Sequence, residues 1–370
     1  DGEYGSNSEI YLTYSFYSAG SGYSYLMDED LDYFSEFSEA AKSKTRSSLE
    51  QIQKFTNLNF IEVSDTSSQF GDLRFTSVKP SGLDSLGLGW FPGSRTWASP
   101  FDDIDGDVFM REFSENEYSQ SGSLPNYILM HEIGHSIGLA HPFQAGTESP
   151  YFHGVGCQCG PCKMAQEFTF GSNSEKGSAS RDSSVYTVMS YGFSPDGYGE
   201  MNLSRPMSGS YMIDDVIALQ YLYGTDNSFS AGDNIYDYSF FSDDNQGFIK
   251  SVYDAGGTDT FDFSNQVFQT KGGLNTNDFL FLDGNLSNGT LTAPNDPDIL
   301  HLTEFEGVIG IANSYIERFF GGDGSDEVTA GANGSLFFGG FAERVVDAFV
   351  AGSGSDELFV YDSGVANLKI

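Results

Sequence analysis

The most constraining feature of this sequence is the run HEIGHSIGLAH at residues 131–141, which fits the pattern HExxHxxGxxH. On a helix, His131 and His135 lie one turn apart on the same face, so both imidazoles can reach one ion. His141 can reach the same ion from the segment that follows the helix. Three neutral nitrogen ligands that leave a fourth position open are typical of a catalytic zinc site and not of a structural one.

Two further residues of this pattern have chemical roles. Glu132 lies beside the first histidine, where it can hold a water molecule against the ion and act as general base. Gly138 lets the chain leave the helix in a conformation that other residues avoid. A bare HExxH occurs by accident in many helices, but the longer pattern fixes five residue types and is expected by chance about once per ten million positions. We therefore interpret the three histidines as metal ligands and not as core histidines.

The pattern resembles that of the metzincin metalloproteases. Their second hallmark is a downstream Met-turn, and residues 188–192 (VMSYG) are similar to it. The resemblance implies that Met189 forms an apolar floor under the zinc ligands. It also implies that Tyr191 ligates zinc at rest and swings away on substrate binding to stabilise the oxyanion. His141 is followed by Pro142, as in the serralysin branch of the metzincins.

Three other segments resemble serralysins: residues 12–16 (LTYSF), 215–224 (DVIALQYLYG) and 253–263 (YDAGGTDTFDF). The resemblance runs from about residue 10 to about residue 330. It implies an α+β protein, in which a metzincin catalytic domain with a twisted mixed sheet and an active-site helix precedes an all-β, calcium-binding β-roll or β-sandwich domain. The chain departs from the family in the long spacing between His141 and Met189, which lie 48 positions apart, so the family's substrate preference is not carried over.

Two stretches match the nine-residue repeat GGxGxDxUx, which winds a calcium-bound β-roll in RTX proteins. Residues 321–329 (GGDGSDEVT) fit completely, whereas residues 351–359 (AGSGSDELF) lack the first glycine. Their offset of 30 residues is not a multiple of nine, so the repeats are sparse and predict few sites. Ordinary Gly-rich hairpins are the alternative interpretation.

The resemblance implies further calcium ligands where the two domains join. One site would use backbone groups before the first strand of the second domain together with the segment at 254–259. A second site would include Glu317, although Tyr315 stands where the family has Thr. Calcium binds oxygen ligands from carboxylates and backbone carbonyls. The candidate calcium ligands are Ser230, Gly232, Asn234, Asp254, Gly256, Gly257, Asp259, Glu317, Gly322, Gly324, Asp326, Gly354 and Asp356.

The three cysteines, Cys157, Cys159 and Cys162, form one CxCxxC cluster. A local disulfide that leaves one thiol over, a second zinc site completed by His153, and unpaired thiols all remain open. The cluster lies in a stretch of irregular composition at 142–184, between the third histidine and the Met-turn. We expect this insertion to form a flap near the active-site cleft.

Length and charge limit the organisation and the partners of the chain. At 370 residues it can hold two domains, which we place at 1–230 (zinc protease) and 231–370 (RTX-like). The net charge of −36 gives a surface that repels nucleic acid and anionic membranes, so we expect neither as a partner. We also expect the protein to be a monomer. No apolar run reaches the roughly 18–20 residues that span a bilayer.

Hydrophobic periodicity and turn residues predict the elements that carry these motifs. The active-site helix is predicted at 124–138, and Gly/Ser/Pro-rich residues 79–104 are predicted to be loop that holds Trp90 and Trp97. The other predicted elements are a strand at 8–17, a helix at 30–56, strands at 59–63, 73–78 and 107–110, a helix at 211–222, and many short strands after 224.

The resemblance thus implies a secreted zinc endopeptidase of a Gram-negative bacterium, with one catalytic Zn²⁺, several structural Ca²⁺ ions, and proteins or peptides as substrates. One alternative is a processing protease of narrow specificity, gated by the 142–184 insertion. Another is a non-enzymatic, calcium-stabilised interaction module. Such a module has no use for the histidines, Glu132 and the Met-turn together, so the enzyme is favoured.

Overall fold

The chain forms two compact units in a computed structural model. Unit 1 comprises Asp1–Asp182, Val188–Tyr191 and Ala218–Thr225, and unit 2 comprises Ser183–Thr187, Gly192–Ile217 and Asp226–Ile370. The domain limits predicted from the sequence, 1–230 and 231–370, stay a prediction. The structure describes residues 8–22, 32–83, 85–92, 104–119, 122–142, 183–191, 207–241, 248–266, 269–274, 279–283, 305–311, 316, 318–320, 326–330, 336–338, 348–350, 357–359 and 367–369.

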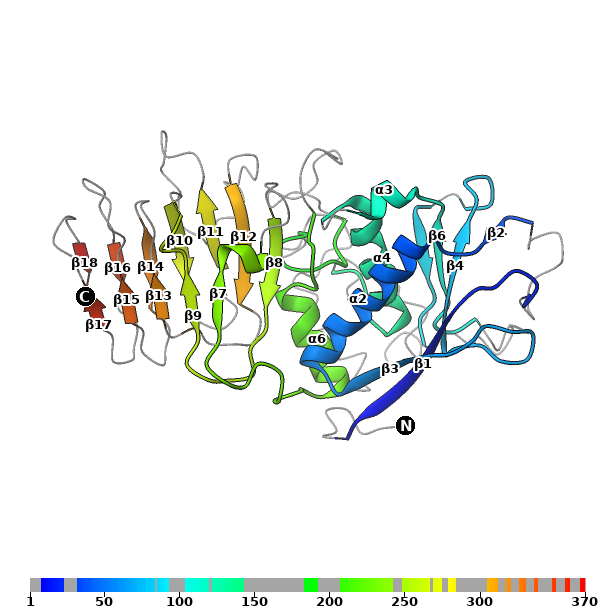
Figure 1. The fold of residues 1–370 in the computed structure, drawn as a ribbon, viewed down its shortest axis with the longest axis horizontal. Helices are drawn as coiled ribbons and strands as arrows, with labels where there is room; N and C mark the ends of the chain where they lie inside the picture. The colour runs from blue at the N-terminus through cyan, green and yellow to red at the C-terminus, as the bar shows by residue number, and fades with distance from the viewer. Residues whose placement is uncertain are drawn as a thin grey trace. The chain divides into compact units, whose positions relative to one another are not determined.

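Unit 1 is built on a mixed sheet in the order β3-β1-β4-β6-β5, with β2 paired to β4 (Figure 1). Strands β1, β3, β4 and β6 run parallel to their neighbours, whereas β2 and β5 pair antiparallel. This mixed sheet with its helices agrees with the α+β class expected for the first domain. The strands are β1 (Ile10–Phe16), β2 (Phe34–Ser35), β3 (Leu58–Glu62), β4 (Leu73–Val78), β5 (Gly87–Gly89) and β6 (Val108–Arg111).

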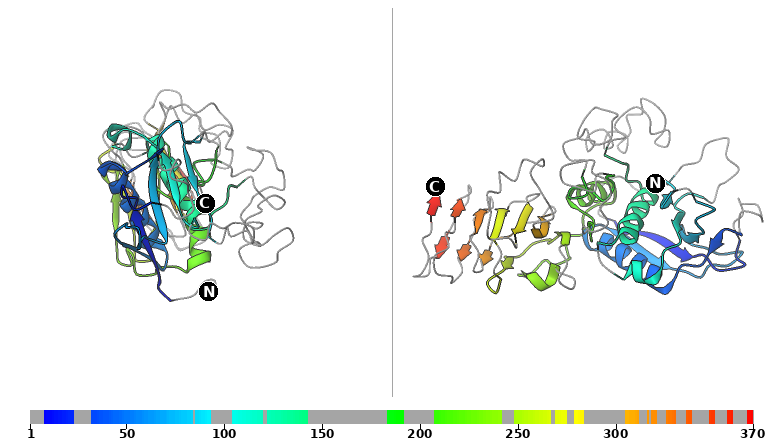
Figure 2. Two further views of the ribbon diagram at one scale, coloured as in Figure 1. Left: turned by 90° about the vertical axis from the view of Figure 1, so that its right-hand side faces the viewer. Right: turned by 90° about the horizontal axis from the view of Figure 1, so that it is seen from above.

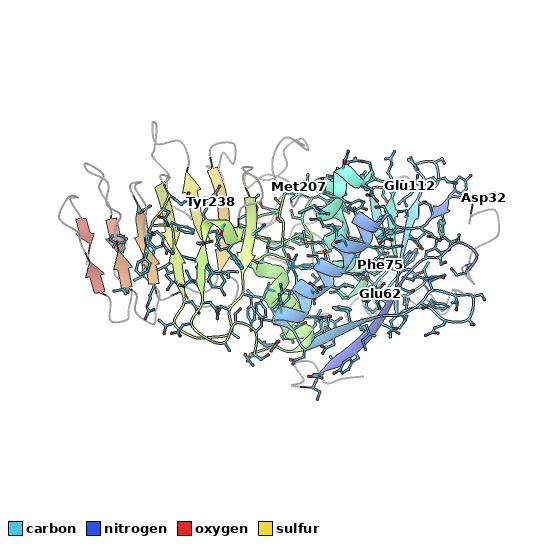
Figure 3. All side chains as sticks on the ribbon, in the orientation of Figure 1. Asp32, Glu62, Phe75, Glu112, Met207 and Tyr238 are labelled. Carbon is cyan, nitrogen blue, oxygen red and sulfur yellow. The ribbon has the colours of Figure 1, made fainter. Side chains whose placement is uncertain are left out.

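The core of unit 1 is rich in aromatic side chains. Phe75 of β4 is fully buried (Figure 3), and its ring lies 5.8–6.2 Å from the rings of Tyr14, Phe16 and Phe37. Such edge-to-face and tilted pairs each contribute about 0.5–1.5 kcal/mol beyond the burial of their area. The alternating apolar residues of β1, which predicted this strand, supply two of these rings.

Helix α2 (Glu39–Phe55) begins later than the predicted start near residue 30. Phe34 of β2 pairs with Val78 of β4, so the chain is still extended there. The helix starts where Ser38 caps it: the Ser38 hydroxyl oxygen accepts a hydrogen bond from the Ala41 N–H. This cap satisfies one of the N–H groups that every helix leaves unpaired at its start.

Helix α4 (Leu124–Ser136) carries the first part of the histidine motif. It ends two residues before the predicted end at 138. Gly138 has φ +105°, a left-handed conformation that favours glycine. The N–H of Leu139 then donates to the carbonyl of Gly134 at 2.8 Å, and this reversal redirects the chain after the helix. A short helix, α3 (Glu115–Tyr118), precedes it.

The sequence interpretation of residues 79–104 as loop was wrong at β5. Its three residues pair antiparallel with Val108, Phe109 and Met110 of β6. The glycines that suggested a loop instead allow close packing of the strand on α4. Trp90, directly after β5, packs against a small buried cluster of Tyr17, Val78 and Phe109, whereas Trp97 lies outside the described residues.

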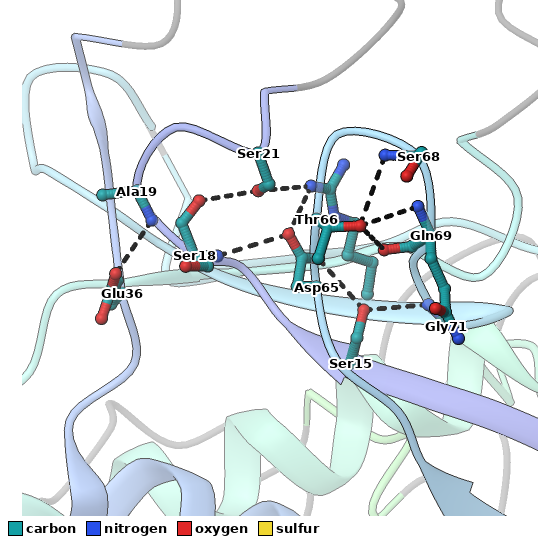
Figure 4. A network of polar contacts seen from close by, with 11 residues as sticks. Ser15, Ser18, Ala19, Ser21, Glu36, Asp65, Thr66, Ser68, Gln69 and Gly71 are labelled. Atoms are coloured by element: carbon teal, nitrogen blue, oxygen red, sulfur yellow. Dashed lines mark hydrogen bonds and ion pairs between the residues drawn. The ribbon is translucent and has the colours of Figure 1, made fainter.

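A buried ion pair joins the segment after β3 to β4 (Figure 4). The Arg74 guanidinium donates to both carboxylate oxygens of Asp65, at 2.6 and 2.8 Å, and the two side chains are 3% and 0% exposed. The Ser15 hydroxyl and the Ser18 N–H also donate to Asp65, and Arg74 donates to Ser21. The network therefore ties both ends of the segment to β1 and its following turn.

Unit 2 contains two sheets of short strands, in the orders β18-β16-β14-β10-β11-β12-β8 and β17-β15-β13-β9-β7 (Figures 1 and 2). From β13 onward, successive strands alternate between the two sheets, and each pairs parallel with the strand two positions along the chain. The strands are β7 (Ile235–Asp237), β8 (Phe248–Val252), β9 (Thr260–Asp262), β10 (Gln269–Gly273), β11 (Phe279–Asp283), β12 (Phe305–Ile311), β13 (Arg318–Phe320), β14 (Glu327–Thr329), β15 (Leu336–Phe338), β16 (Ala348–Val350), β17 (Glu357–Phe359) and β18 (Asn367–Lys369).

The core of unit 2 lies between these sheets. Phe261 and Phe319 come from one sheet and Ile309, Val328 and Phe349 from the other, and all belong to one buried cluster. A short helix, α7 (Tyr238–Phe241), follows β7. Helix α6 (Ile213–Tyr223) comes before β7 in the chain, and its residues from Ala218 onward are assigned to unit 1. That unit 2 binds calcium remains a prediction. Within the described residues, no helix has the length and apolar character needed to cross a membrane.

Candidate metal centre and active site

The three histidines of the motif converge at the end of α4. The Nε2 atom of His131 lies 3.1 Å from those of His135 and His141, and the Nε2 atoms of His135 and His141 lie 3.0 Å apart. All three side chains are buried. The helix places the first two on one face, and the reversal at Gly138 returns the third to them.

Backbone carbonyls orient two of these imidazoles. Nδ1 of His131 lies 2.8 Å from the carbonyl oxygen of Val188, and Nδ1 of His135 lies 2.8 Å from that of Leu139. A carbonyl can only accept, so each Nδ1 carries the proton and each Nε2 carries a lone pair. Burial lowers the pKa of His131 to about 4, and burial together with the neighbouring histidines lowers the pKa of His135 well below its ordinary value. Both rings are therefore neutral at pH 7.

This donor set fits zinc. Neutral imidazole nitrogens are common zinc ligands, and three of them leave one position open for water or substrate. The second nitrogen of a zinc-bound histidine ordinarily donates to a carbonyl or carboxylate, as those of His131 and His135 do here. The three histidines also have ligand atoms that all lie within 4.8 Å of one another.

Glu132 lies next to the cluster and is only 7% exposed. Burial raises the pKa of its carboxyl to about 8, although a hydrogen bond from the N–H of Gly89 opposes this shift. A carboxylate whose pKa lies near neutrality is suited to accept a proton and then return it. The sequence placed this residue by adjacency alone, and the structure adds its partner on β5.

The Met-turn segment packs directly under α4. The Tyr127 hydroxyl donates to the carbonyl of Ser190 at 2.7 Å, and Val188 accepts from His131, so two contacts tie the segment to the helix. Met189 is 2% exposed. A Cβ atom on Gly134 would lie 2.5 Å from the Met189 sulfur, so this glycine makes room for the thioether.

Tyr191 lies against the histidines. Its ring centroid is 5.5 Å from that of His131 and 4.6 Å from that of His141. Burial, and then the charge of Glu132, raise the pKa of its hydroxyl above the ordinary value, so this group is a proton donor at neutral pH. The structure thus brings together the five residues expected at the zinc site and Met189.

The predicted calcium ligands between residues 230 and 259 also lie together, in unit 2. The side-chain nitrogen of Asn234 lies 3.0 Å from the carbonyl oxygen of Ser230, 2.6 Å from that of Gly232 and 3.1 Å from Oδ2 of Asp254. The N–H of Asn234 donates to Oδ1 of Asp259 at 2.9 Å. Three oxygen atoms therefore surround the side-chain nitrogen of Asn234, and the Asp259 carboxylate accepts from the backbone of the same residue.

The remaining calcium candidates are placed in part. Gly256 donates its N–H to Asp254, and a Cβ atom on Gly257 would lie 2.5 Å from the carbonyl of Gly232, so both glycines adjoin this point. Asp326, from the complete repeat, is 1% exposed. Residues Glu317, Gly322, Gly324, Gly354 and Asp356 lie outside the described residues, as do Cys157, Cys159, Cys162 and the insertion around them.

Several residues that shape the site were not found from the sequence. Three glycines leave space for an atom of another segment: Gly87, Gly89 and Gly134. Two other residues orient histidines through their backbone carbonyls, namely Val188 and Leu139. Contacts of this kind join residues far apart in the chain, or use atoms that every residue has. The GLG spacing of β5 was the one available signal, and it was interpreted as loop.

Comparison with known proteins finds no matching family model, but it finds similar proteins. The chain is 27% identical over 252 residues to a serralysin of Proteus mirabilis, covering 62% of this chain and 45% of that protein. It is 29% identical over 270 residues to a serralysin of Photorhabdus sp. (strain Az29), covering 68% and 48%. It is 25% identical over 340 residues to the metallopeptidase AprA of Pseudomonas marginalis, covering 88% and 61%.

Among solved structures, that of myroilysin matches with a TM-score of 0.32 and 14% identity, over 60% of this chain and 94% of that one. The chain spans about half the length of the first two curated relatives. The expected resemblance is confirmed by the sequence matches, which include proteins named as serralysins and as a metallopeptidase. The chain is therefore a serralysin-like relative of these metallopeptidases.

Proposed function

We propose that this protein is a zinc-dependent endopeptidase that hydrolyses peptide bonds in proteins or peptides. The observation that carries the proposal is the convergence of three buried imidazoles beside a buried carboxyl group. The likeness to serralysins and to AprA metallopeptidases supports the same reaction class. A purely structural metal site would use four protein ligands and would have no need of Glu132.

The proposed mechanism assigns one task to each side chain. His131, His135 and His141 would hold zinc, which when bound polarises the scissile carbonyl and acidifies a water molecule. Glu132 accepts the proton of the attacking water and passes it to the nitrogen of the leaving amine. The Tyr191 hydroxyl donates a hydrogen bond to the developing oxyanion. Met189 and Gly134 keep the floor of the site apolar and closely packed.

The decisive experiment compares casein cleavage by the wild type and by Glu132→Gln, with zinc measured in both proteins. The amide is nearly isosteric with the carboxylate but cannot accept the proton, so kcat should fall by about 10²–10⁴-fold. One zinc per chain should remain in both, since Glu132 is not a ligand. Near-normal cleavage by the variant would show that Glu132 is not the general base.

A wild type that binds zinc but leaves casein intact would instead support a processing protease with few substrates. A panel of peptides of varied length then separates narrow specificity from absence of activity. Loss of zinc from Glu132→Gln would make the residue part of the metal site. A metal-free wild type that still cleaves casein would overturn the zinc mechanism as a whole.

We also infer that unit 2 binds calcium and that the protein acts outside the cell. The converging oxygens of Ser230, Gly232 and Asp254 are of the type that calcium prefers. Calcium sites of moderate affinity fill at the millimolar concentrations found outside cells. The likeness to serralysins of Gram-negative bacteria such as Proteus mirabilis fits the same location.

A further inference from the structure

Strand β5 approaches α4 more closely than side chains on its inner face would allow. A Cβ atom added to Gly87 would lie 2.6 Å from Cγ and 2.8 Å from Oε1 of Glu132. A Cβ atom added to Gly89 would lie 2.3 Å from the backbone carbonyl oxygen of Glu132 and 3.0 Å from Cβ of His135. Real Cβ atoms essentially never make contacts below 3.0 Å, so a methyl group at either position forces a neighbouring group to shift.

The sheet fixes where β5 lies. The N–H of Arg111 donates to the carbonyl of Leu86, and the N–H of Trp90 donates to that of Asp107, so both ends of the strand are held on β6. Successive side chains of a strand point to opposite faces. Leu88 is 39% exposed, whereas the positions on either side of it face α4. Strand β5 is therefore held in place by β6, and Glu132 packs against its inner face.

Gly89 also contributes a polar contact on this face of β5. Its backbone N–H is close enough to the Glu132 carboxylate to oppose the rise in the pKa of that group. Gly87 limits the space beside the same carboxylate, with an ideal Cβ 2.8 Å from Oε1. Gly89 thus contacts the Glu132 carboxylate through its backbone, and Gly87 limits the space that the same side chain can occupy.

We propose that Gly87 and Gly89 are positioning residues for the general base, and that together they set where the Glu132 carboxylate lies relative to the three histidines. The inference rests on the proposed function, in which Glu132 moves the proton. A base must lie within hydrogen-bond reach of the proton that it accepts. A misplacement of about 1 Å can cost about 10²-fold in rate.

The two glycines should respond differently to an added methyl group. At Gly87 the methyl meets only side chains, Cγ and Oε1 of Glu132 and, at 2.9 Å, Cγ2 of Ile128. The Glu132 carboxylate therefore moves while the backbone stays in place. At Gly89 it meets the backbone of α4, which cannot turn aside, so β5 itself must shift. Gly87→Ala is therefore expected to act on turnover, and Gly89→Ala on stability.

The first test measures kcat, KM and zinc content for Gly87→Ala. We expect kcat to fall by about 10- to 100-fold, with KM within about threefold of the wild type and one zinc retained. Gly71→Ala is the matched control, because its Cβ would lie 2.3 Å from the backbone of Tyr14, away from the histidines. The folded fraction of that variant should keep the wild-type kcat. An unchanged kcat in Gly87→Ala, or an equal loss in Gly71→Ala, would overturn the proposal.

The second test is a double-mutant cycle followed by thermal unfolding of the metal-free protein. Glu132→Ala removes the two closest atoms that Gly87→Ala would meet and leaves only Cγ2 of Ile128 at 2.9 Å, so Gly87→Ala should lower Tm less in that background than in the wild type. Gly89→Ala should lower Tm equally in both backgrounds, because the carbonyl of residue 132 remains. Equal Tm changes for Gly87→Ala in both backgrounds contradict the positioning role. This cycle needs no activity, so it decides the geometry even if the wild type cleaves no peptide.

Discussion

After the histidines and Glu132, Tyr191 is the residue whose contacts most clearly indicate a role in the site. Its ring packs on two imidazoles, and its hydroxyl stays protonated at neutral pH because burial raises the pKa. Tyr191→Phe keeps the ring and removes only the hydroxyl. We expect kcat to fall by about 10²-fold or less, as for loss of one oxyanion donor, while zinc content and Tm stay near those of the wild type. Loss of zinc from the variant would instead make the tyrosine a structural ligand.

At the residue scale, the sequence predicted the members of the site whose spacing is local. His131, Glu132 and His135 are fixed relative to one another by one helix, and Gly138 supplies the positive φ that returns His141. The glycines of β5 could not be predicted, because their constraint is an atom of Glu132 more than 40 residues away. A glycine in a Gly-rich stretch is indistinguishable from loop until its neighbour in space is known.

Among the elements of unit 1, the segment between β3 and β4 depends on the Arg74–Asp65 pair. Removing Arg74 leaves a buried carboxylate without its cation, which costs about 3–5 kcal/mol in the free energy of unfolding. Arg74→Gln should therefore destabilise the protein strongly in urea unfolding at pH 7. The matched control is Arg46→Gln, because Arg46 pairs with Glu62 at the surface, where both side chains are 39% exposed. That variant should lose about 1 kcal/mol or less.

The same pair predicts a pH dependence. Burial opposes ionisation of Asp65, but the hydrogen bonds and the charge of Arg74, together with the hydrogen bond from Ser15, outweigh it, and its pKa lies below the ordinary value. A lowered pKa contributes stability that is present above the unfolded value, near 4, and is lost as pH falls through the folded value. The wild type should therefore lose this contribution only below about pH 4. In Arg74→Gln the sign should reverse, since protonating the unpaired carboxyl relieves the strain as pH falls.

Element boundaries show where periodicity was insufficient. The apolar stripe predicted α2, but its start was wrong because pairing of Phe34 with Val78 keeps the chain extended up to the cap at Ser38. Strand β4 was predicted at its observed bounds, Leu73–Val78, and all six of its residues are buried in the mixed sheet. The start of α2 depends on the pairing of β2 with β4, and the periodicity of the sequence carries no information about such pairing.

Across the whole chain, the C-terminal strands are more regular than the repeat motifs. β13, β14 and β15 begin at Arg318, Glu327 and Leu336, nine residues apart, and β16 and β17 begin at Ala348 and Glu357, again nine apart. The offset of 30 residues between the two matching repeats arises because the interval from β15 to β16 is twelve residues. Strand alternation between the two sheets therefore continues where the glycine and aspartate motif does not, so motif counting underestimates the extent of this architecture.

Calcium dependence is the property of the whole molecule that the acidic composition and the converging oxygens predict together. The net charge of −36 opposes compaction, and Asp254 and Asp259 are buried with 3% and 1% exposure. An ion bound only by the folded state stabilises it by about 2.7 kcal/mol at one hundred times its Kd. Calcium-free protein reloaded with zinc should therefore rise in Tm as CaCl₂ is added.

The variant Asp254→Asn isolates the site at the start of unit 2 from any others. It removes the charge of a carboxylate that lies 3.1 Å from the Asn234 nitrogen, so equilibrium dialysis should show about one calcium ion fewer per chain and a smaller rise in Tm. The control Asp237→Asn changes a carboxylate of β7 that bonds to its own turn at Ser239, and it should keep the wild-type stoichiometry. Equal calcium binding by both variants would place the ions elsewhere. A wild-type Tm that does not change with calcium would show that the ion does not stabilise the fold. The packed core between the two sheets would then stabilise unit 2 without calcium.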